Sequence, residues 1–192
     1  GLLRTIMPRT PVYCRLSRVI RDIPSIAIHA GNQETNFREV AERDMAAKGI
    51  QVRDIRAREV KDTAVAEHDV TLTCEAYETT VSQELFLAYE AHDKLLGFCR
   101  LSLPTTDAIT PELCGAAMIR EVHVYGQSLG LGQTSGTHAQ HRGLGTRLVD
   151  EAARRARAAG FERLAVISAI GTRPYYRRLG FEDGVLYMHR LV

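Results

Sequence analysis

A short glycine-containing segment, residues 140–146, has the residue types that bind phosphate groups. Its residues are Gln140, His141, Arg142, Gly143, Leu144, Gly145 and Thr146. It follows a strand-like segment at 118–125 and opens a helical pattern over 143–159. Glycines let the backbone approach a ligand, and the N–H groups and dipole of a helix N-terminus attract negative oxygens. We therefore expect a pyrophosphate at this helix start; the alternative is that the glycines serve helix packing alone.

Arginines near the N-terminus are a second set of candidate phosphate contacts. Residues 1–62 contain 12 basic and 8 acidic residues, so this segment is basic within a chain of net charge +2. Two groups recur at about every third residue and consist of Arg15, Arg18, Arg21, Arg53, Arg56 and Arg58. A guanidinium group matches phosphate oxygens and stays charged at neutral pH. Binding of a nucleic-acid backbone is one hypothesis; a solvated surface or ion pairs within the segment are the others.

The composition excludes several classes of protein. The chain has 192 residues, of which 45% are apolar and 25% charged, a balance typical of a compact globular protein. Because the sequence has neither a long apolar run nor a signal peptide, we expect a cytoplasmic protein with no membrane contact. The four cysteines form no Cys-x-x-Cys pair, so we predict reduced, buried thiols and no metal site. They are Cys14, Cys74, Cys99 and Cys114.

The hydrophobic pattern predicts an α/β protein with an N-terminal α/β extension. Strands are expected at 26–28, 70–76, 84–90, 95–101, 118–125, 164–168 and 185–191. Helices, each followed by a glycine, are expected at 37–48, 143–159 and 174–179. The period changes from helical to alternating after about residue 62, and we place a domain boundary there.

The strand at 118–125 is predicted to alternate strictly between two faces. One face is expected to carry Ile119, Glu121, His123 and Tyr125, and the other Met118, Arg120, Val122 and Val124. The first face places a carboxylate beside an imidazole, and both groups can transfer protons. Glu121 and His123 are therefore candidate general bases; a structural or RNA-facing role is the alternative.

The glycine segment and a later block, Tyr-Tyr-Arg-Arg-Leu-Gly-Phe at 175–181, resemble in this order the motifs of the GCN5-related N-acetyltransferase (GNAT) superfamily. The resemblance covers residues 63–192. It implies a mixed central sheet flanked by helices, with acetyl-CoA in a V-shaped gap between the fourth and fifth strands.

This resemblance also implies roles for individual residues. The segment 140–146 would hold the pyrophosphate of acetyl-CoA, and residues 122–124 would offer backbone groups to the pantetheine. Tyr175 or Tyr176 would face the thioester sulfur, where a hydroxyl can protonate a departing thiolate. Core packing is the alternative role for the tyrosines.

A narrower resemblance extends over nearly the whole chain. Five blocks in a fixed order, at 18–24, 53–60, 120–126, 140–145 and 171–180, are similar to the C-terminal part of the Elp3 family, the catalytic subunits of Elongator. In that family a radical-SAM domain precedes the acetyltransferase domain, and the pair modifies C5 of the tRNA wobble uridine with acetyl-CoA as carbon source. The family also uses a [4Fe–4S] cluster and S-adenosylmethionine, but the cysteine triplet for the cluster is absent from this sequence.

The resemblance leads to one hypothesis and two alternatives. Residues 63–192 are expected to bind acetyl-CoA and to hydrolyse it in response to tRNA, as the acyltransferase domain of an enzyme that carboxymethylates U34. Residues 1–62 are expected to be the basic junction that follows the radical-SAM region, in a chain that is a fragment or a naturally short form. The partners implied are tRNA and either other Elongator-like subunits or a second copy of the chain. The alternatives are a stand-alone N-acetyltransferase of a protein lysine or small amine, and a non-catalytic tRNA-docking module.

Overall fold

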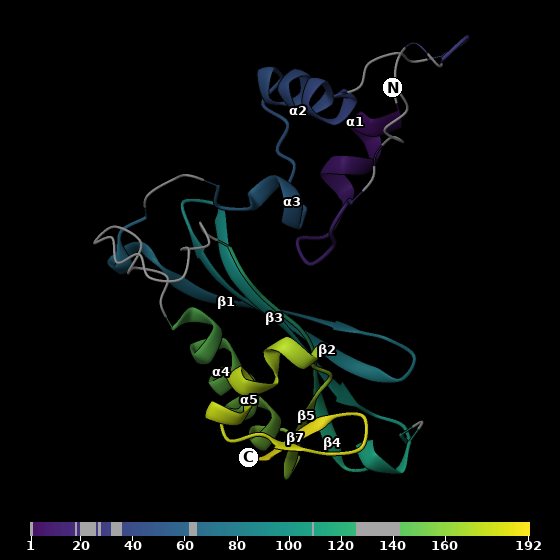
Figure 1. Ribbon diagram of the computed structural model, residues 1–192. Coiled ribbons are helices and arrows are strands. Elements are labelled where there is room, and N and C mark those ends of the chain that lie inside the picture. The colour runs from purple at the N-terminus through teal and green to yellow at the C-terminus, as the bar shows by residue number, and fades with distance from the viewer. Residues whose placement is uncertain are drawn as a thin grey trace. The chain divides into compact units, whose positions relative to one another are not determined.

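The chain forms two compact units, Gly1–Glu59 and Val60–Val192. The division lies three residues before the boundary expected at residue 62. The computed structural model describes residues 2–17, 19, 26, 28–31, 36–61, 65–108, 110–125 and 143–192. Among these, the larger unit holds the sheet and the longest helix, and the smaller unit holds three α-helices (Figure 1).

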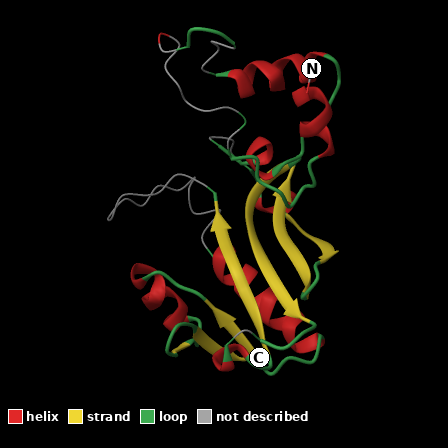
Figure 2. Cartoon of the chain, turned by 90° about the vertical axis from the view of Figure 1, so that its right-hand side faces the viewer, coloured by secondary structure: helices red, strands yellow, loops and turns green. Residues whose placement is uncertain are grey.

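The larger unit is built on one mixed sheet of seven strands in the order β1-β2-β3-β4-β5-β7-β6. Neighbouring strands are antiparallel except β4 and β5, which are parallel. The strands are β1 (Thr71–Glu78), β2 (Ser82–Ala91), β3 (Lys94–Pro104), β4 (Ala116–Val124), β5 (Arg163–Val166), β6 (Glu182–Asp183) and β7 (Met188–Leu191). Helices, drawn in red in Figure 2, lie beside this sheet, whose strands are drawn in yellow. The predicted α/β class and mixed, helix-flanked sheet are confirmed.

The long helix α4 (Leu144–Ala158) covers the middle of the sheet, where it contacts β2, β3, β4 and β5. Its buried side chains form a stripe with helical spacing and are Leu144, Leu148, Val149, Ala152, Ala153 and Ala156. The strands β2 and β3 are buried along most of their length, so they read as apolar runs. A second helix, α5 (Arg173–Arg178), follows β5 at its predicted place.

A β-bulge in β4 changes which of its side chains share a face. Arg100 of β3 pairs with Glu121, but the next residue, Leu101, pairs with Ile119, so Arg120 has no partner of its own in β3. Because Arg100 and Leu101 point to opposite faces, Ile119 lies on the face opposite to Glu121. The expected strict alternation is therefore wrong at Ile119, and also at Met118, which pairs with Ser102 and so shares the face of Arg100 and Glu121. A bulge is a property of the pairing of two strands, so the pattern of one strand could not show it.

The C-terminal strand is shorter than predicted. The strand expected at 185–191 begins only at Met188, because the preceding residues form a tight turn in which the N–H of Gly184 donates to the carbonyl of Tyr187 at 2.8 Å. The carboxylate of Glu112 fixes this turn by accepting the N–H groups of Leu186 and Tyr187 at 3.0 and 3.2 Å. The strand β6 on the other side of the turn has two residues, too few to leave a periodic signal.

The smaller unit is helical in its described residues. Its α-helices are α1 (Leu2–Ile6), α2 (Phe37–Ala47) and α3 (Ile55–Arg58), and a 3-10 helix follows α1 at Met7–Arg9. The helix predicted at 37–48 is confirmed as α2. The strand expected at 26–28 is wrong at both of its described residues: Ile26 and Ile28 lie outside any strand, and Ile26 is 92% exposed. Two branched apolar residues form no strand without a neighbour that pairs with them, so the described part of this extension is not α/β.

The remaining compositional expectations concern membranes, metals and thiols. Among the described residues, no helix is long and apolar enough to cross a membrane, and no group of three His, Cys, Asp or Glu side chains could hold a metal ion. All four cysteines are free; Cys99 is buried, and Cys14 and Cys74 are partly buried. Cys114 is exposed, so the expectation of four buried thiols is wrong there.

Candidate functional site

The N-terminus of α4 has the geometry of an anion-binding site. Gly143 precedes the helix in the left-handed conformation, with φ of 91°, which favours glycine. The first N–H groups of a helix have no acceptor within it and lie at the positive end of its dipole. The N–H groups of Leu144, Gly145 and Thr146 are thus candidate donors to an anion. The preceding site residues, Gln140, His141 and Arg142, lie outside the described residues.

Three predicted site residues from three elements meet at Gly145. A Cβ atom on Gly145 would lie 2.8 Å from the hydroxyl oxygen of Tyr175 in α5 and 3.7 Å from Cγ2 of Val124 in β4. The first distance is shorter than a real Cβ atom tolerates, so this approach requires glycine. The start of α4, the end of β4 and the first turn of α5 therefore form one junction, which we call the Gly145 junction.

The sheet opens beside the Gly145 junction. The strands β4 and β5 pair only as far as Ile119 and Val166, and β4 then continues to Val124. On its other edge β4 remains paired with β3 up to Gly97 and Val124. Backbone groups of residues 120–124 that point away from β3 therefore have no described strand to pair with. This is the stretch that the family resemblance assigns to the pantetheine.

The candidate catalytic residues lie on two faces of the sheet. Val124 points toward Gly145 on α4, and His123 points to the other face because neighbouring residues of a strand alternate. Glu121 shares the face of His123. The structure thus brings together Val124, Gly145 and Tyr175, and it holds Glu121 and His123 as a second group across β4. Both groups lie beside residues 120–124, the part of β4 that does not pair with β5.

The two tyrosines of α5 keep their protons at neutral pH. Tyr176 packs edge-to-face on Tyr175 and Phe181, with ring centroids 5.1 and 5.5 Å apart, and burial raises the pKa of Tyr176 to about 12. Burial also raises the pKa of Tyr175, and Thr146 opposes this shift only in part. The hydroxyl oxygen of Tyr175 is shielded from solvent and has no partner of normal hydrogen-bond geometry among the described residues. A buried hydroxyl in this state is ready to donate to a ligand.

Glu121 is held by an arginine that the sequence analysis missed. Arg100 donates from Nε to the Glu121 carboxylate at 2.9 Å. Its guanidinium carbon lies 5.4 Å from the ring centroids of both Phe86 and Phe98, which adds cation–π attraction. The signal available in the sequence was a single charged residue within the apolar run of β3. Arg100 thus fixes Glu121 on the face of the sheet that also carries His123.

His123 is exposed and rests on aromatic rings. Its imidazole stacks on Phe98, with centroids 5.9 Å apart and an interplanar angle of 13°, and it lies 4.4 Å from the ring of Tyr125. These contacts orient the ring of a side chain that is exposed to solvent. An accessible imidazole can take a proton from water or from an acceptor group.

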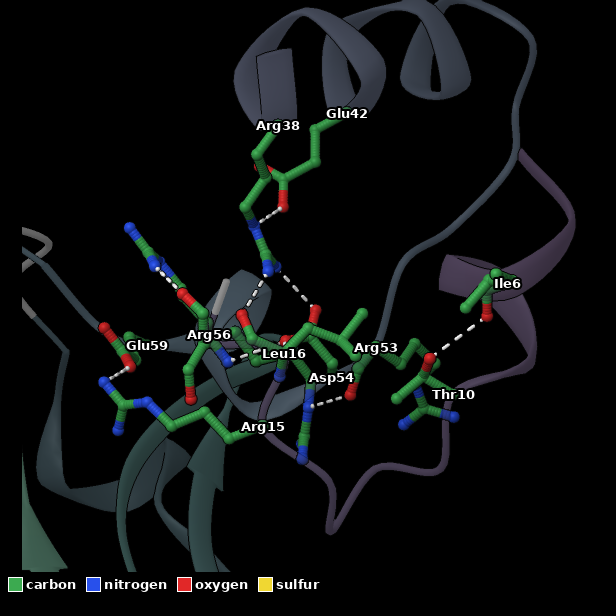
Figure 3. A network of polar contacts seen from close by, with 12 residues as sticks. Ile6, Thr10, Arg15, Leu16, Arg38, Glu42, Arg53, Asp54, Arg56 and Glu59 are labelled. Atoms are coloured by element: carbon green, nitrogen blue, oxygen red, sulfur yellow. Dashed lines mark hydrogen bonds and ion pairs between the residues drawn. The ribbon is translucent and has the colours of Figure 1, made fainter. Parts of the chain in front are cut away.

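Several of the predicted arginines form ion pairs or hydrogen bonds within the smaller unit. Arg15 pairs with Glu59 at 2.7 Å, and Arg56 donates to a backbone carbonyl at 2.8 Å (Figure 3). Arg58 is buried and donates to two backbone carbonyls at 2.9 and 3.0 Å, whereas Arg53 is exposed. Contacts within the unit, the alternative considered from the sequence, thus account for Arg58. The other two arginines, Arg18 and Arg21, lie outside the described residues.

Asp54 is the centre of these contacts, although nothing in the sequence marks it as such. Its fully buried carboxylate caps α3 by accepting the N–H of Arg56 and also accepts the N–H of Leu16. Arg38 of α2 donates to Asp54 at 2.7 Å, to the carbonyl of Leu16 at 2.8 Å and to Glu42 at 2.7 Å (Figure 3). The only local signal was an acidic residue before a short helix, which marks an N-cap but not its distant partner.

Substitution Asp54→Ala is expected to destabilise the chain by about 3–5 kcal/mol, because it removes the fully buried carboxylate that pairs with the largely buried Arg38 and accepts the N–H groups of Leu16 and Arg56. The free energy of unfolding in urea measures this loss. Asp44→Ala is the matched control, since Asp44 pairs with Arg4 and Lys48 at an exposed position and should matter much less. Equal losses in the two variants would contradict the central role of Asp54.

The sequence pattern of the acetyltransferase (GNAT) family matches residues 52–181. This range contains β1 to β5, α4 and α5, and therefore both the Gly145 junction and the opening between β4 and β5. The chain belongs to this family, as its glycine segment and its tyrosine block predicted.

Over its whole length the chain is similar to proteins of the Elp3 family. It is 37% identical over 199 residues to Elongator complex protein 3 of Homo sapiens, covering 100% of this chain and 36% of that protein. It is 38% identical over 197 residues to the tRNA uridine(34) acetyltransferase of Dehalococcoides mccartyi (strain CBDB1), covering 98% and 42%. The structure of an archaeal Elp3 from Methanocaldococcus infernus matches with a TM-score of 0.81 at 30% identity, covering 100% of this chain and 47% of that one. The predicted resemblance is confirmed, and the chain spans less than half the length of each relative.

Proposed function

We propose that this chain is the acetyl-CoA-binding domain of a tRNA-modifying acetyltransferase, and that it hydrolyses acetyl-CoA in response to tRNA during carboxymethylation at C5 of U34. The Gly145 junction carries the cofactor part of this proposal, because only glycine admits the close approach of Tyr175 to the start of α4. The tRNA part is supported by the similarity to a protein named tRNA uridine(34) acetyltransferase.

The residues at the Gly145 junction fit acetyl-CoA. When bound, acetyl-CoA supplies an acetyl group activated as a thioester. The N–H groups of Leu144, Gly145 and Thr146 would hold the pyrophosphate, together with residues 140–142. The backbone groups of 122–124 that point away from β3, which have no described strand to pair with, would bind the amides of the pantetheine, as a neighbouring strand would.

The side chains around the opening would divide the proton transfers between them. Tyr175 has a buried hydroxyl that makes no hydrogen bond of normal geometry among the described residues, so it would donate to the departing sulfur, with Tyr176 packed behind it. His123 is the better placed of the two candidate bases, because Arg100 already occupies the carboxylate of Glu121. His123 would take a proton from the attacking water.

The smaller unit would contact the phosphate backbone of tRNA. The exposed side chains of Arg15, Arg53 and Arg56 are the described candidates for this contact, whereas the buried Arg58 would act by holding the unit together. This chain lacks the cysteine triplet that would ligate an iron–sulfur cluster, the group that works with S-adenosylmethionine in the Elp3 family. Other Elongator-like subunits or a second copy of the chain are further proposed partners.

Hydrolysis of acetyl-CoA by the purified chain, measured with and without tRNA, tests this function. We expect tRNA to stimulate hydrolysis, and we expect Arg53→Glu with Arg56→Glu to remove most of the stimulation while the exposed control Arg43→Glu keeps it. Acetylation of a lysine peptide or a small amine without tRNA would instead indicate the stand-alone N-acetyltransferase. Binding of tRNA with neither hydrolysis nor acetyl transfer would indicate a docking module.

A further inference from the structure

A buried acidic side chain of β2 contacts the residue that forms the bulge of β4. Glu84 of β2 is 2% exposed, and its Oε1 atom accepts a hydrogen bond from the hydroxyl of Ser82 at 2.8 Å. Its Oε2 atom is shielded from solvent and lies 3.2 Å from Nη1 of Arg120. Arg120 is the bulged residue, which has no partner in β3. A carboxylate from one strand thus reaches across β3 to the irregular residue of β4.

The pair is expected to add little stability, because the side chain of Arg120 is half exposed while Glu84 is buried. Burial of an ionised carboxylate carries a desolvation penalty of several kcal/mol, and apolar replacements of buried ion pairs are often neutral or stabilising. Most positions of β2 are buried, so an apolar residue at position 84 would suit the strand. Better supported roles for buried ionic groups are to select one register or one arrangement of the chain.

The bulge lies where a change in the register of β4 would alter the candidate site. Pairing of β4 with β5 ends at Ile119, one residue before Arg120, so the bulge lies where the sheet opens. The bulge also reverses the alternation, and it alone places Glu121 and His123 opposite to Ile119. A shift of the bulge by one residue would turn the side chains and backbone groups between the old and new positions to the other side of the strand.

We propose that Glu84 is a positioning residue that holds Arg120, and through it the bulge of β4, in the register that presents Glu121 and His123 to the opening between β4 and β5. This inference rests on the proposed function for its effect on turnover. Its structural part, the fixed register of β4, stands independently of any ligand.

The test compares Glu84→Gln with Glu78→Gln, a control that removes an exposed acid from the neighbouring strand β1. For Glu84→Gln we expect amide hydrogen exchange in residues 119–124 to rise at least about tenfold and kcat for acetyl-CoA hydrolysis to fall at least about tenfold. The melting temperature should stay unchanged or rise, a combination that a purely structural role would not give. Glu78→Gln should match the unaltered chain in all three measurements.

A double-mutant cycle then tests whether Glu84 acts through Arg120. The double variant Glu84→Gln/Arg120→Gln should lose no more kcat than Glu84→Gln alone, because both changes remove one contact. Unchanged exchange in residues 119–124 of Glu84→Gln would overturn the proposal. A fall in kcat together with a lower melting temperature would also overturn it, because general destabilisation would then explain the loss. If the unaltered chain hydrolyses no acetyl-CoA, the proposed function fails, and the exchange measurement alone decides the role of Glu84.

Discussion

Substitution Gly145→Glu is expected to weaken acetyl-CoA binding by about 100-fold or more, equivalent to about 3 kcal/mol. The new side chain would begin 2.8 Å from the hydroxyl of Tyr175, and its carboxylate would repel the phosphates at the start of α4. Titration calorimetry with acetyl-CoA measures the affinity. Gly171→Ala is the control, because a Cβ atom on Gly171 would meet nothing within 4 Å.

A rescue separates the close approach at Gly145 from a general loss of folding. Gly145→Ala alone should weaken binding, since its Cβ atom overlaps the Tyr175 hydroxyl. Adding Tyr175→Phe removes that oxygen and leaves the ring carbon 3.7 Å away, an ordinary contact, so the double variant should recover affinity. Unchanged affinity in Gly145→Glu, or no recovery in the double variant, would contradict the junction as the binding site.

Substitution Tyr175→Phe is expected to lower kcat for acetyl-CoA hydrolysis by about 100-fold with little change in affinity. The phenylalanine keeps the packing against Tyr176 and removes only the hydroxyl that would donate to the departing sulfur. Steady-state hydrolysis and calorimetry measure the two quantities. Tyr187→Phe, in the turn before β7, is the control and should leave both unchanged. Full turnover in Tyr175→Phe together with a loss of turnover in Tyr176→Phe would show that Tyr176, and not Tyr175, is the donor.

The raised pKa values of these tyrosines set the pH dependence. A proton donor works only while protonated, and burial raises the pKa of Tyr175 and raises that of Tyr176 to about 12. Neither hydroxyl should therefore lose its proton as the pH rises from 7 to about 9, and kcat should not fall over this range on their account. A decline in that range that disappears in Tyr175→Phe would contradict the assignment.

Local patterns predicted most elements of the fold. The buried stripe of α4 and the apolar runs of β2 and β3 are imposed by packing, so they leave strong periodic signals. The weak or missing predictions depend on distant partners. The turn at 184–187 is fixed by Glu112 from another part of the chain, and the bulge at Arg120 exists only in the pairing of β4 with β3.

The candidate site divides in the same way. The glycine at 145 was recognisable because close backbone approach restricts the residue type, and the structure supplies its cause in the hydroxyl of Tyr175. The contact of Arg100 with Glu121 and the burial of Asp54 and Glu84 were not recognisable, since a charged residue has the same appearance in a sequence whether solvent or a partner surrounds it.

The most direct test of the account is to locate acetyl-CoA on the unaltered chain by the backbone amide resonances of the labelled protein. Saturable addition of acetyl-CoA is expected to shift the amides of residues 144–146 at the start of α4 and of residues 122–124 along the edge of β4 that has no described strand to pair with. The absence of saturable shifts, or shifts confined to residues outside these two segments, would contradict the account.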